Sequence, residues 1–495
     1  MKYMNLITIN NISKKILKII QSNKIFILIF ILGTFFFFWH LDYKSLWLDE
    51  SMSVYYSISL KNLFGAIISY ESNMWFYYFL LYIWLHLGST EFTIRALSAL
   101  FAVITIIGVY WLGNIIKNRQ LGLIAAGLFI INTYTVTFSQ EARSYSLLAC
   151  LLTYLSIFFY YCLIKGSHIN WIYYTILALL SIYTHIYAII IIMLQLILIY
   201  LFKKKTNNIH LFLSIASIIL FSVPLLLLAK RHLQNIAWIP QPIFYDFYKV
   251  LLAFTSQNIF LLVIFLILIF WGIWKVTKVK NEDIKILFYR YLLLWAFFPI
   301  IFLYIFSIVI KPVFMERYFA ISIVGFILLV ATGIESIKNN YIKCLLSILI
   351  FIISIYSLQL FYKNVTNENW KNLGNFIQSN REKEDKIIIY PNFTYAPVWY
   401  YVFDKVEVKA KSKNNIYIHD YLKNDSKDLY IDDKLQLEKT VMNTKRLWFI
   451  TSHDEKDNGR ILAKNQIIKY LDKKFIYKKE RHFQGSLKLY FYSNE

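Results

Sequence analysis

Apolar segments of helical length, separated by short polar loops, fill the first 362 residues of the chain. Most are close to the ~20 residues that a helix needs to cross the hydrocarbon core of a bilayer. The pattern predicts an all-α polytopic membrane domain with about 11–13 transmembrane helices. The predicted crossings are 25–39, 73–88, 96–116, 121–138, 145–164, 171–183, 187–202, 209–229, 258–274, 287–310, 318–337 and 343–362.

The last part of the chain, 363–495, has a different pattern. Apolar residues at Trp370, Leu373, Phe376 and Ile377 recur with helical spacing. Short runs rich in β-branched and aromatic residues predict strands, and these are Lys386–Tyr390, Leu447–Thr451 and Leu487–Tyr492. We therefore expect two domains: a transmembrane domain, 1–362, and a small soluble α/β domain, 363–495.

Basic loops predict the orientation of the helices. Cytoplasmic loops carry an excess of Lys and Arg, so the N-terminal lysines Lys14, Lys15, Lys18 and Lys24 and the run Lys203–Lys205 are expected inside. Counting crossings from these anchors places the soluble domain outside the cytoplasm. The same count places five polar segments on the outer face: 42–72, 140–143, 184–187, 230–248 and 311–318.

One crossing does not fit this count. Three apolar segments lie between two loops that are expected on the same face, so either one of them is re-entrant or short, or a further span is hidden. We suspect 73–88, which has fewer residues than a full crossing needs.

The composition of the chain excludes several classes of protein. With 58% hydrophobic and only 16% charged residues, the chain is too apolar for a soluble enzyme or a disordered protein. The net charge of +23 belongs mostly to loop anchors rather than to a basic face, which argues against nucleic acid as a partner. The three cysteines, Cys150, Cys162 and Cys344, lie in or beside apolar segments and predict neither a disulfide framework nor a metal cluster.

Two adjacent carboxylates, Asp49 and Glu50, are the sharpest candidates for chemistry. On an outer loop they are suited to act as a general base and its partner, or to bind a hard divalent cation. An acidic pair in a loop is more often simply solvated. Their rarity favours function, because the first 362 residues contain only 11 acidic side chains.

Basic and aromatic residues on the same face form the other candidates. Glu141, Arg143 and Tyr145 stand at the start of a predicted helix, where a helix-end pair is the simpler interpretation. Lys311, Arg317 and Tyr318 suit an anionic group at the bilayer surface, although such residues also anchor helices at the interface.

His185 is a weaker candidate, because a lone histidine at a helix turn is usually a polar cap. Taken together, the clusters suit displacement at the anomeric carbon of a lipid-phosphate sugar. A carboxylate would deprotonate the acceptor, and cations would stabilise the leaving phosphate.

At these residues the chain resembles the GT-C glycosyltransferases that use polyprenyl-phosphate sugars. It is most similar to the protein O-mannosyltransferases and the lipid A aminoarabinose transferases (glycosyltransferase family 39-like). The resemblance covers most of the chain and runs through Trp47–Glu50, Phe76–Trp84, Phe92–Leu100, Gln140–Tyr145, Tyr183–Tyr187, Glu316–Tyr318 and Asn369–Trp370.

The resemblance implies an inverting glycosyltransferase in a bacterial plasma membrane. Asp49 would be the catalytic carboxylate with Glu50 as its neighbour, and Glu141 would lie at the acidic or polar site of the second loop. Arg317 and Tyr318 would contact the donor phosphate, with Arg143, Tyr145, His185 and Lys311 as further substrate-binding candidates. Its partners would be a polyprenyl-phosphate-linked sugar, a cell-envelope acceptor (glycan, lipid or protein) and the bilayer.

The chain departs from the family pattern in two places. Ser51–Ser53 replaces an arginine that some relatives carry after the acidic pair, and Asn73–Phe76 replaces prolines before the paired tyrosines. We therefore assign no metal, although a divalent cation would suit the carboxylates.

Two alternatives remain at the level of sequence. A flippase or transporter for lipid-linked sugars would bind the same ligand, but transporters usually show internal repeats and mid-span charges. A scaffold for envelope assembly would leave Asp49 and Glu50 without a role. Sequence does not identify the sugar, the acceptor or the oligomeric state.

Overall fold

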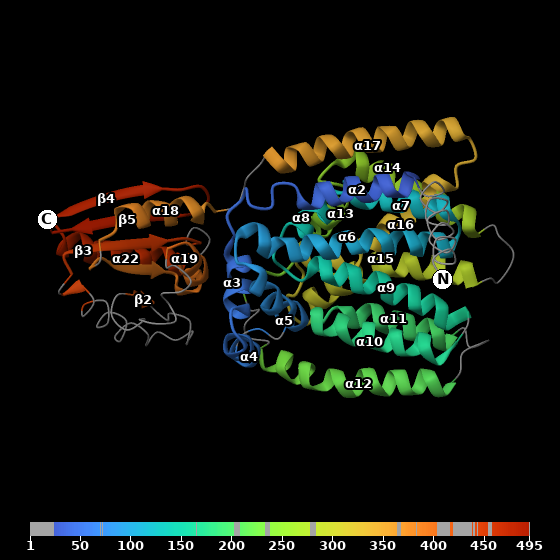
Figure 1. Ribbon diagram of the computed structural model, residues 1–495, viewed down its shortest axis with the longest axis horizontal. Coiled ribbons are helices and arrows are strands. Elements are labelled where there is room, and N and C mark those ends of the chain that lie inside the picture. Colours follow the sequence, from blue (N-terminus) through green and yellow to red (C-terminus); the bar gives the residue numbers. More distant parts are fainter. Residues whose placement is uncertain are drawn as a thin grey trace, which may run out of the picture. The chain divides into compact units, whose positions relative to one another are not determined.

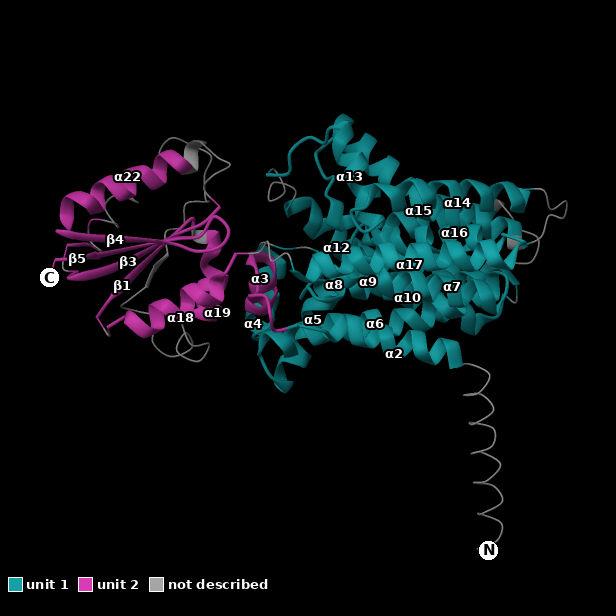
Figure 2. Cartoon of the chain, turned by 90° about the horizontal axis from the view of Figure 1, so that it is seen from above, with its two compact units in different colours: residues 1–41, 57–363 teal, residues 42–56, 364–495 magenta. Residues whose placement is uncertain are grey.

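The computed structural model describes most of the chain, which divides into two compact units. The described residues are 24–69, 71, 73–164, 166–201, 208–232, 238–277, 284–363, 368–382, 384–402, 416–418, 438, 441, 442, 444–453 and 458–494. Unit 1 comprises Met1–Leu41 and Ser57–Lys363, and unit 2 comprises Asp42–Tyr56 and Asn364–Glu495 (Figure 2). The expected cytoplasmic anchors Lys14, Lys15, Lys18 and Lys203–Lys205 lie outside the described residues.

This division differs in one respect from the expected domains. The change of unit between Lys363 and Asn364 lies one residue from the boundary that the sequence indicates. The segment Asp42–Tyr56, expected in the first domain, is instead grouped with the C-terminal residues.

Unit 1 is built from helices that pack side by side (Figure 1). They are α2 (Lys24–Phe38), α4 (Leu60–Ser69), α5 (Trp75–Trp84), η1 (Leu85–Leu87), α6 (Glu91–Ile116), α7 (Arg119–Ile131), α8 (Thr133–Ser139), α9 (Tyr145–Ile164), α10 (His168–Thr184), α11 (Ala188–Leu201), α12 (Asn208–Arg231), α13 (Phe244–Phe254), α14 (Ile259–Thr277), α15 (Ile284–Val309), η3 (Glu316–Ile321), α16 (Ile323–Glu335) and α17 (Asn340–Lys363). Every predicted crossing therefore corresponds to a helix or a pair of helices.

Six helices of the described chain are long and apolar enough to cross a membrane, and a bent pair makes a seventh. Their burial separates an inner and an outer layer. In α9, 78% of the most apolar window is buried, whereas in α17 only 22% is buried. A helix that is apolar all round and still exposed is typical of a lipid-facing span.

The bent pair, α7 and α8, turns by 65° at Asn132. Asn132 has an extended backbone, and its Oδ1 accepts hydrogen bonds from the backbone N–H groups of Tyr134 and Thr135. This is an N-cap, which starts a new helix and so ends the first one. The sequence indicated 73–88 as the irregular crossing; α5 is short, and the bent pair is a second irregular segment in the same region.

Two short helices of unit 1 are absent from the sequence-based prediction. They are α4, in the polar stretch after the first crossing, and α13, in the expected outer loop. Both expose apolar side chains, among them Phe64 on α4 and Phe244 on α13.

Unit 2 contains α3 (Leu48–Ser57), α18 (Trp370–Asn380), β1 (Lys386–Tyr390), η4 (Asn392–Thr394), α19 (Tyr395–Tyr401), β2 (Ile416–Ile418), β3 (Arg446–Thr451), α22 (Asn458–Lys474), β4 (Tyr477–His482) and β5 (Lys488–Ser493). The sheet has the order β2-β1-β3-β5-β4, in which β1 is parallel to β2 and β3. The pairs β3–β5 and β4–β5 are antiparallel.

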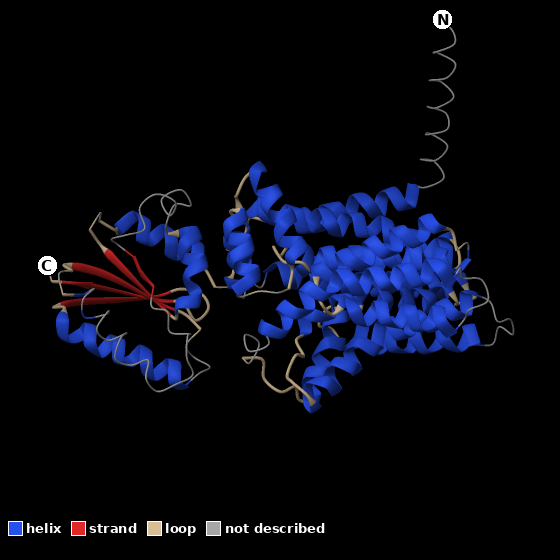
Figure 3. Cartoon of the chain, turned by 90° about the horizontal axis from the view of Figure 1, so that it is seen from below, coloured by secondary structure: helices blue, strands red, loops and turns tan. Residues whose placement is uncertain are grey.

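Helices cover both faces of this sheet (Figure 3), with α22 on one face and α18 and α19 on the other (Figure 2). The core against α22 contains Phe449, Leu471 and Tyr492. The layered arrangement confirms the expected α/β class.

The three predicted strands and the helix at Trp370 are confirmed, within a residue at each end. The sequence missed β4, whose residues YKKERH are all exposed. Charges on an edge strand keep it from pairing with other chains. The same charges replace the alternating apolar pattern by which a strand is predicted.

Candidate functional site

The candidate residues fall into two groups, one in each unit. Asp49 and Glu50 belong to unit 2, whereas Arg143, His185 and Arg317 belong to unit 1. The group in unit 1 is a buried cluster of cationic and aromatic side chains.

Arg143 lies in the turn between α8 and α9 and is only 6% exposed. Its guanidinium donates to the hydroxyl of Tyr78 on α5, at 3.4 Å. Its backbone oxygen accepts from the hydroxyl of Ser98 on α6, at 3.3 Å. The arginine is therefore held from two neighbouring helices.

His185 follows the last residue of α10 and is fully buried. Its Nδ1 accepts a hydrogen bond from the backbone N–H of Tyr187, at 3.3 Å. In a neutral imidazole only one nitrogen carries the proton, so this bond places the proton on Nε2. The Nε2 atom is buried and has no hydrogen-bond partner, so the tautomer presents an unused donor.

Aromatic rings surround this histidine. The ring centroid of His185 lies 4.9 Å from that of Tyr187, 5.3 Å from that of Tyr318 and 6.4 Å from that of Tyr145. The Tyr187 hydroxyl donates to the backbone oxygen of Val313, at 2.9 Å. Segments that are far apart in sequence are thus packed around His185 in one cluster.

Burial and the positive charges of two arginines act on the protonation of the histidine. Burial first, and then the charges of Arg143 and Arg317, lower the pKa of His185 from 6.5 to about 3. His185 is therefore neutral at physiological pH. The guanidinium of Arg317 lies 5.9 Å from the centre of the Trp238 ring and 5.7 Å from that of Tyr318, close enough for cation–π attraction.

Three further predicted residues belong to unit 1: Tyr145, Glu141 and Lys311. Tyr145 is the first residue of α9 and is fully buried. Glu141 is half-buried in the turn before it, and its backbone oxygen accepts from the N–H of Arg143, at 2.7 Å. Lys311 is half-buried at the end of α15, where its backbone N–H donates to Phe306.

The two adjacent carboxylates of unit 2 have different environments. Glu50 is fully buried, and its Oε2 accepts from the backbone N–H of Trp47, at 3.2 Å. Trp47 precedes α3, so this is the carboxylate half of a capping box. Asp49, in the first turn of α3, is half-buried. The carboxylate of Glu50 is thus bonded at the start of α3, and Asp49 is the more exposed of the two candidates.

The unit 1 cluster is suited to bind a phosphate. Two guanidiniums provide charge and forked donors, and the neutral histidine adds an N–H at the same place. No group of three or more His, Cys, Asp or Glu side chains in the described parts of the chain is arranged to hold a metal ion.

Tyr78 and Tyr187 enter this site without having been singled out from the sequence. Both lie inside segments that carry the family resemblance, but the chain contains 39 tyrosines. Their contacts with Arg143 and His185 in the folded protein bring them into the site.

Comparison with solved structures identifies the fold. The chain is similar to ArnT from Cupriavidus metallidurans in the apo state, with a TM-score of 0.62 and 12% identity over 94% of this chain and 98% of that one. It is also similar to the same protein bound to undecaprenyl phosphate, with a TM-score of 0.61 and 10% identity over 95% and 98% of the two chains.

A third similar structure is the archaeal oligosaccharyltransferase AglB from Archaeoglobus fulgidus, in complex with an inhibitory peptide and a dolichol-phosphate. Its TM-score is 0.54, with 12% identity over 97% of this chain and 74% of that one. The sequence matches no protein-family model and no curated protein.

The chain thus has the fold of a polytopic membrane protein of the GT-C type, as the sequence resemblance implied. Within that class, its structural neighbours include ArnT, a lipid A aminoarabinose transferase, and AglB.

Proposed function

We propose that the chain is a multi-pass glycosyltransferase. It moves one sugar from a polyprenyl-phosphate donor to a cell-envelope acceptor on the outer face of the plasma membrane. The N-terminus is cytoplasmic and the C-terminal domain is outside. The structures of similar fold that contain undecaprenyl phosphate and dolichol-phosphate support a lipid-phosphate ligand.

One observation carries this proposal: the unused Nε2–H donor of His185, under the positive charge of Arg143 and Arg317. A buried donor without a partner costs free energy unless a ligand accepts from it. A phosphate oxygen supplies the acceptor and brings negative charge next to the two arginines. His185, Arg143 and Arg317 then stabilise the negative charge that develops on the phosphate as the sugar leaves.

The reaction is a single displacement with inversion. The acceptor hydroxyl attacks the anomeric carbon while its proton passes to the Asp49 carboxylate. The bond between the anomeric carbon and the phosphate oxygen breaks, and its electron pair remains on the phosphate. The products are the glycosylated acceptor and free polyprenyl phosphate.

The first test uses purified full-length protein and a panel of polyprenyl-phosphate sugars, and it measures the release of free polyprenyl phosphate. We expect the wild type to release it from one donor in the panel. Asp49→Asn should reduce release by at least ~100-fold, because a general base contributes about that much or more. The amount of protein in the membrane should stay unchanged.

Asp42→Asn is the matched control, since Asp42 is an exposed carboxylate of the same segment. It should retain full activity. An active Asp49→Asn protein would contradict the assignment of the base. Tight donor binding without release in any variant would instead favour a flippase for lipid-linked sugars or a missing acceptor.

A further inference from the structure

The order β2-β1-β3 in unit 2 creates a place where open α/β sheets usually bind ligands. Strand β1 is parallel to both neighbours, and the chain runs from β1 to β2 on one side and then to β3 on the other side of β1. Ligands of such sheets bind outside the carboxyl ends of the strands at this reversal. Pro391–Thr394 follows β1 there, and Ser452 and His453 follow β3.

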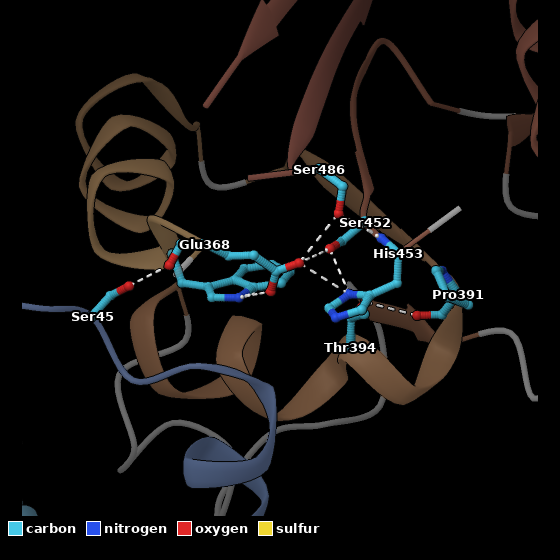
Figure 4. Close-up of polar contacts among 8 residues, drawn as sticks. Ser45, Glu368, Pro391, Thr394, Ser452, His453 and Ser486 are labelled. Carbon is cyan, nitrogen blue, oxygen red and sulfur yellow. Dashed lines mark hydrogen bonds and ion pairs between the residues drawn. The ribbon is translucent and has the colours of Figure 1, made fainter. Parts of the chain in front are cut away.

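The chain's own Glu368 fills this position (Figure 4). Its Oε1 accepts from the hydroxyls of Ser452, at 2.6 Å, and Ser486, at 3.4 Å, and lies 3.1 Å from Nδ1 of His453. Its Oε2 accepts from the indole N–H of Trp370, at 2.7 Å. With a side chain only 12% exposed, both oxygens are bonded to donors of unit 2.

Glu368 also holds the segment that leads to Asp49. The backbone oxygen of Glu368 accepts from the hydroxyl of Ser45, at 2.5 Å. One residue later, the backbone N–H of Leu46 donates to the hydroxyl of Tyr401 on α19, at 2.7 Å. These two bonds fix the backbone shortly before α3 and Asp49.

The far end of α3 is attached to the same unit. The Tyr55 ring packs edge-on against Tyr395, with centroids 5.6 Å apart, and against Trp399, at 5.4 Å. Trp399 is 2% exposed. Asp49 therefore lies between two attachments, one made of hydrogen bonds and one made of aromatic packing.

We propose that Glu368 and Tyr401 are positioning residues for the Asp49 carboxylate. The crevice that would bind a ligand in other α/β domains serves here as a socket for Glu368, which fixes the start of α3. This inference rests on the proposed role of Asp49 as the base. It gives the C-terminal unit a part in the chemical step, in addition to any part in acceptor choice.

The test compares Glu368→Gln, Tyr401→Phe and the milder Ser45→Ala in the full-length protein. Displacement of a reacting group by about 1 Å can cost on the order of 10²-fold in rate. We expect kcat to fall by ~10- to 100-fold in Glu368→Gln and Tyr401→Phe, and less in Ser45→Ala. The KM for the donor should stay within about twofold of the wild type, since the proposed phosphate ligands are untouched.

Asp385→Asn is the control for general damage to unit 2. Asp385 lies at the opposite ends of β1 and β3, where its side chain binds Arg446 at 2.8 Å and the Trp448 indole at 2.7 Å. This variant should lower Tm and leave kcat unchanged. If kcat falls in proportion to Tm in all four variants, the residues have only a structural role and the proposal is wrong.

Hydrogen exchange tests the attachment of α3 independently of whether Asp49 is the base. In Tyr401→Phe, the amides of Leu46–Asp49 should exchange faster while those of β1 and β3 stay protected. If Asp49→Asn proves fully active, the proposed base is wrong, yet this exchange result still decides whether the socket holds α3. Unchanged exchange at Leu46 would overturn the attachment itself.

Discussion

A single hydrogen bond decides the chemistry that His185 can perform. Because Nδ1 accepts from the Tyr187 backbone, the proton is on Nε2, and the side chain acts as a neutral donor rather than as a cation. A charged imidazolium would face two arginines in a buried site, which is strongly unfavourable. In the proposed phosphate site the positive charge therefore comes from Arg143 and Arg317, and the histidine provides a directed N–H donor.

Replacement of His185 tests this role. His185→Phe keeps a ring of similar size and removes the Nε2–H donor. A hydrogen bond to a charged group is worth about 1.5–3 kcal/mol, so the affinity for a polyprenyl-phosphate donor should fall by ~10- to 100-fold. Binding to protein in nanodiscs measures the effect, and His86→Phe, at an exposed position outside the cluster, should bind normally.

The same variant also tests whether His185 is neutral in the folded protein. The test compares the acid stability of the variant with that of the wild type. In the folded state the pKa of His185 is lowered from 6.5 to about 3, so between these values only the unfolded chain binds the proton. Stability is complete above pH 6.5 and is lost as the pH falls below it, by up to ~1.4 kcal/mol per pH unit. Without donor, the wild type should lose more Tm between pH 7.5 and 5.5 than His185→Phe does; equal losses would contradict the assignment.

At the scale of elements, the break between α7 and α8 shows how one polar residue shapes an apolar segment. Asn132 is 4% exposed, and its amide also donates to the backbone oxygen of Phe254 at the end of α13, at 2.7 Å. Asn132 thus ends α7, starts α8 and links both helices to α13.

Asn132→Ala should lower the stability of the purified protein by ~1–3 kcal/mol, because it removes the cap and leaves buried backbone groups unpaired. The change is measured as a fall in apparent Tm in detergent. Asn339→Ala removes the exposed cap of α17 and should cost less, since water replaces that bond. A larger loss at Asn339 would contradict this explanation of the bend.

The whole molecule combines a helical unit and an α/β unit whose sequence segments interleave. Asp42–Tyr56 stands between two segments of unit 1 in the chain but belongs to unit 2. Truncation at the predicted boundary would therefore remove the partners of α3 as well as the C-terminal sheet.

The proposed orientation can be tested by labelling with a membrane-impermeant maleimide in a Cys344→Ser background; Cys150 and Cys162 are buried. Ser379→Cys, at an exposed position of α18, should react in intact cells. Lys338→Cys, in the exposed loop between α16 and α17, should react only after the membrane is opened. The reverse pattern would place the C-terminal unit in the cytoplasm and contradict the proposal.

The sequence alone determined the fold class, the helices of the predicted crossings, the helix at Trp370 and three of the five described strands. These follow from local properties: the length of an apolar segment, the spacing of apolar residues, and the Lys and Arg residues in loops. It also indicated Arg143, His185 and Arg317, which lie in polar segments that carry the family resemblance. The sequence missed the charged edge strand β4, which has no alternating apolar pattern, and α13, which begins in a stretch expected to be an outer loop.

Which of these residues lie close together is known only from the tertiary structure. The convergence of Arg143, His185 and Arg317, the tautomer of His185 and the attachment of α3 to Glu368 and Tyr401 all depend on contacts between residues far apart in sequence. Such contacts are set by the packing of whole elements, which no local pattern encodes. The difference between Asp49 and Glu50 has the same origin, because adjacent carboxylates differ in burial only once α3 has folded against its neighbours.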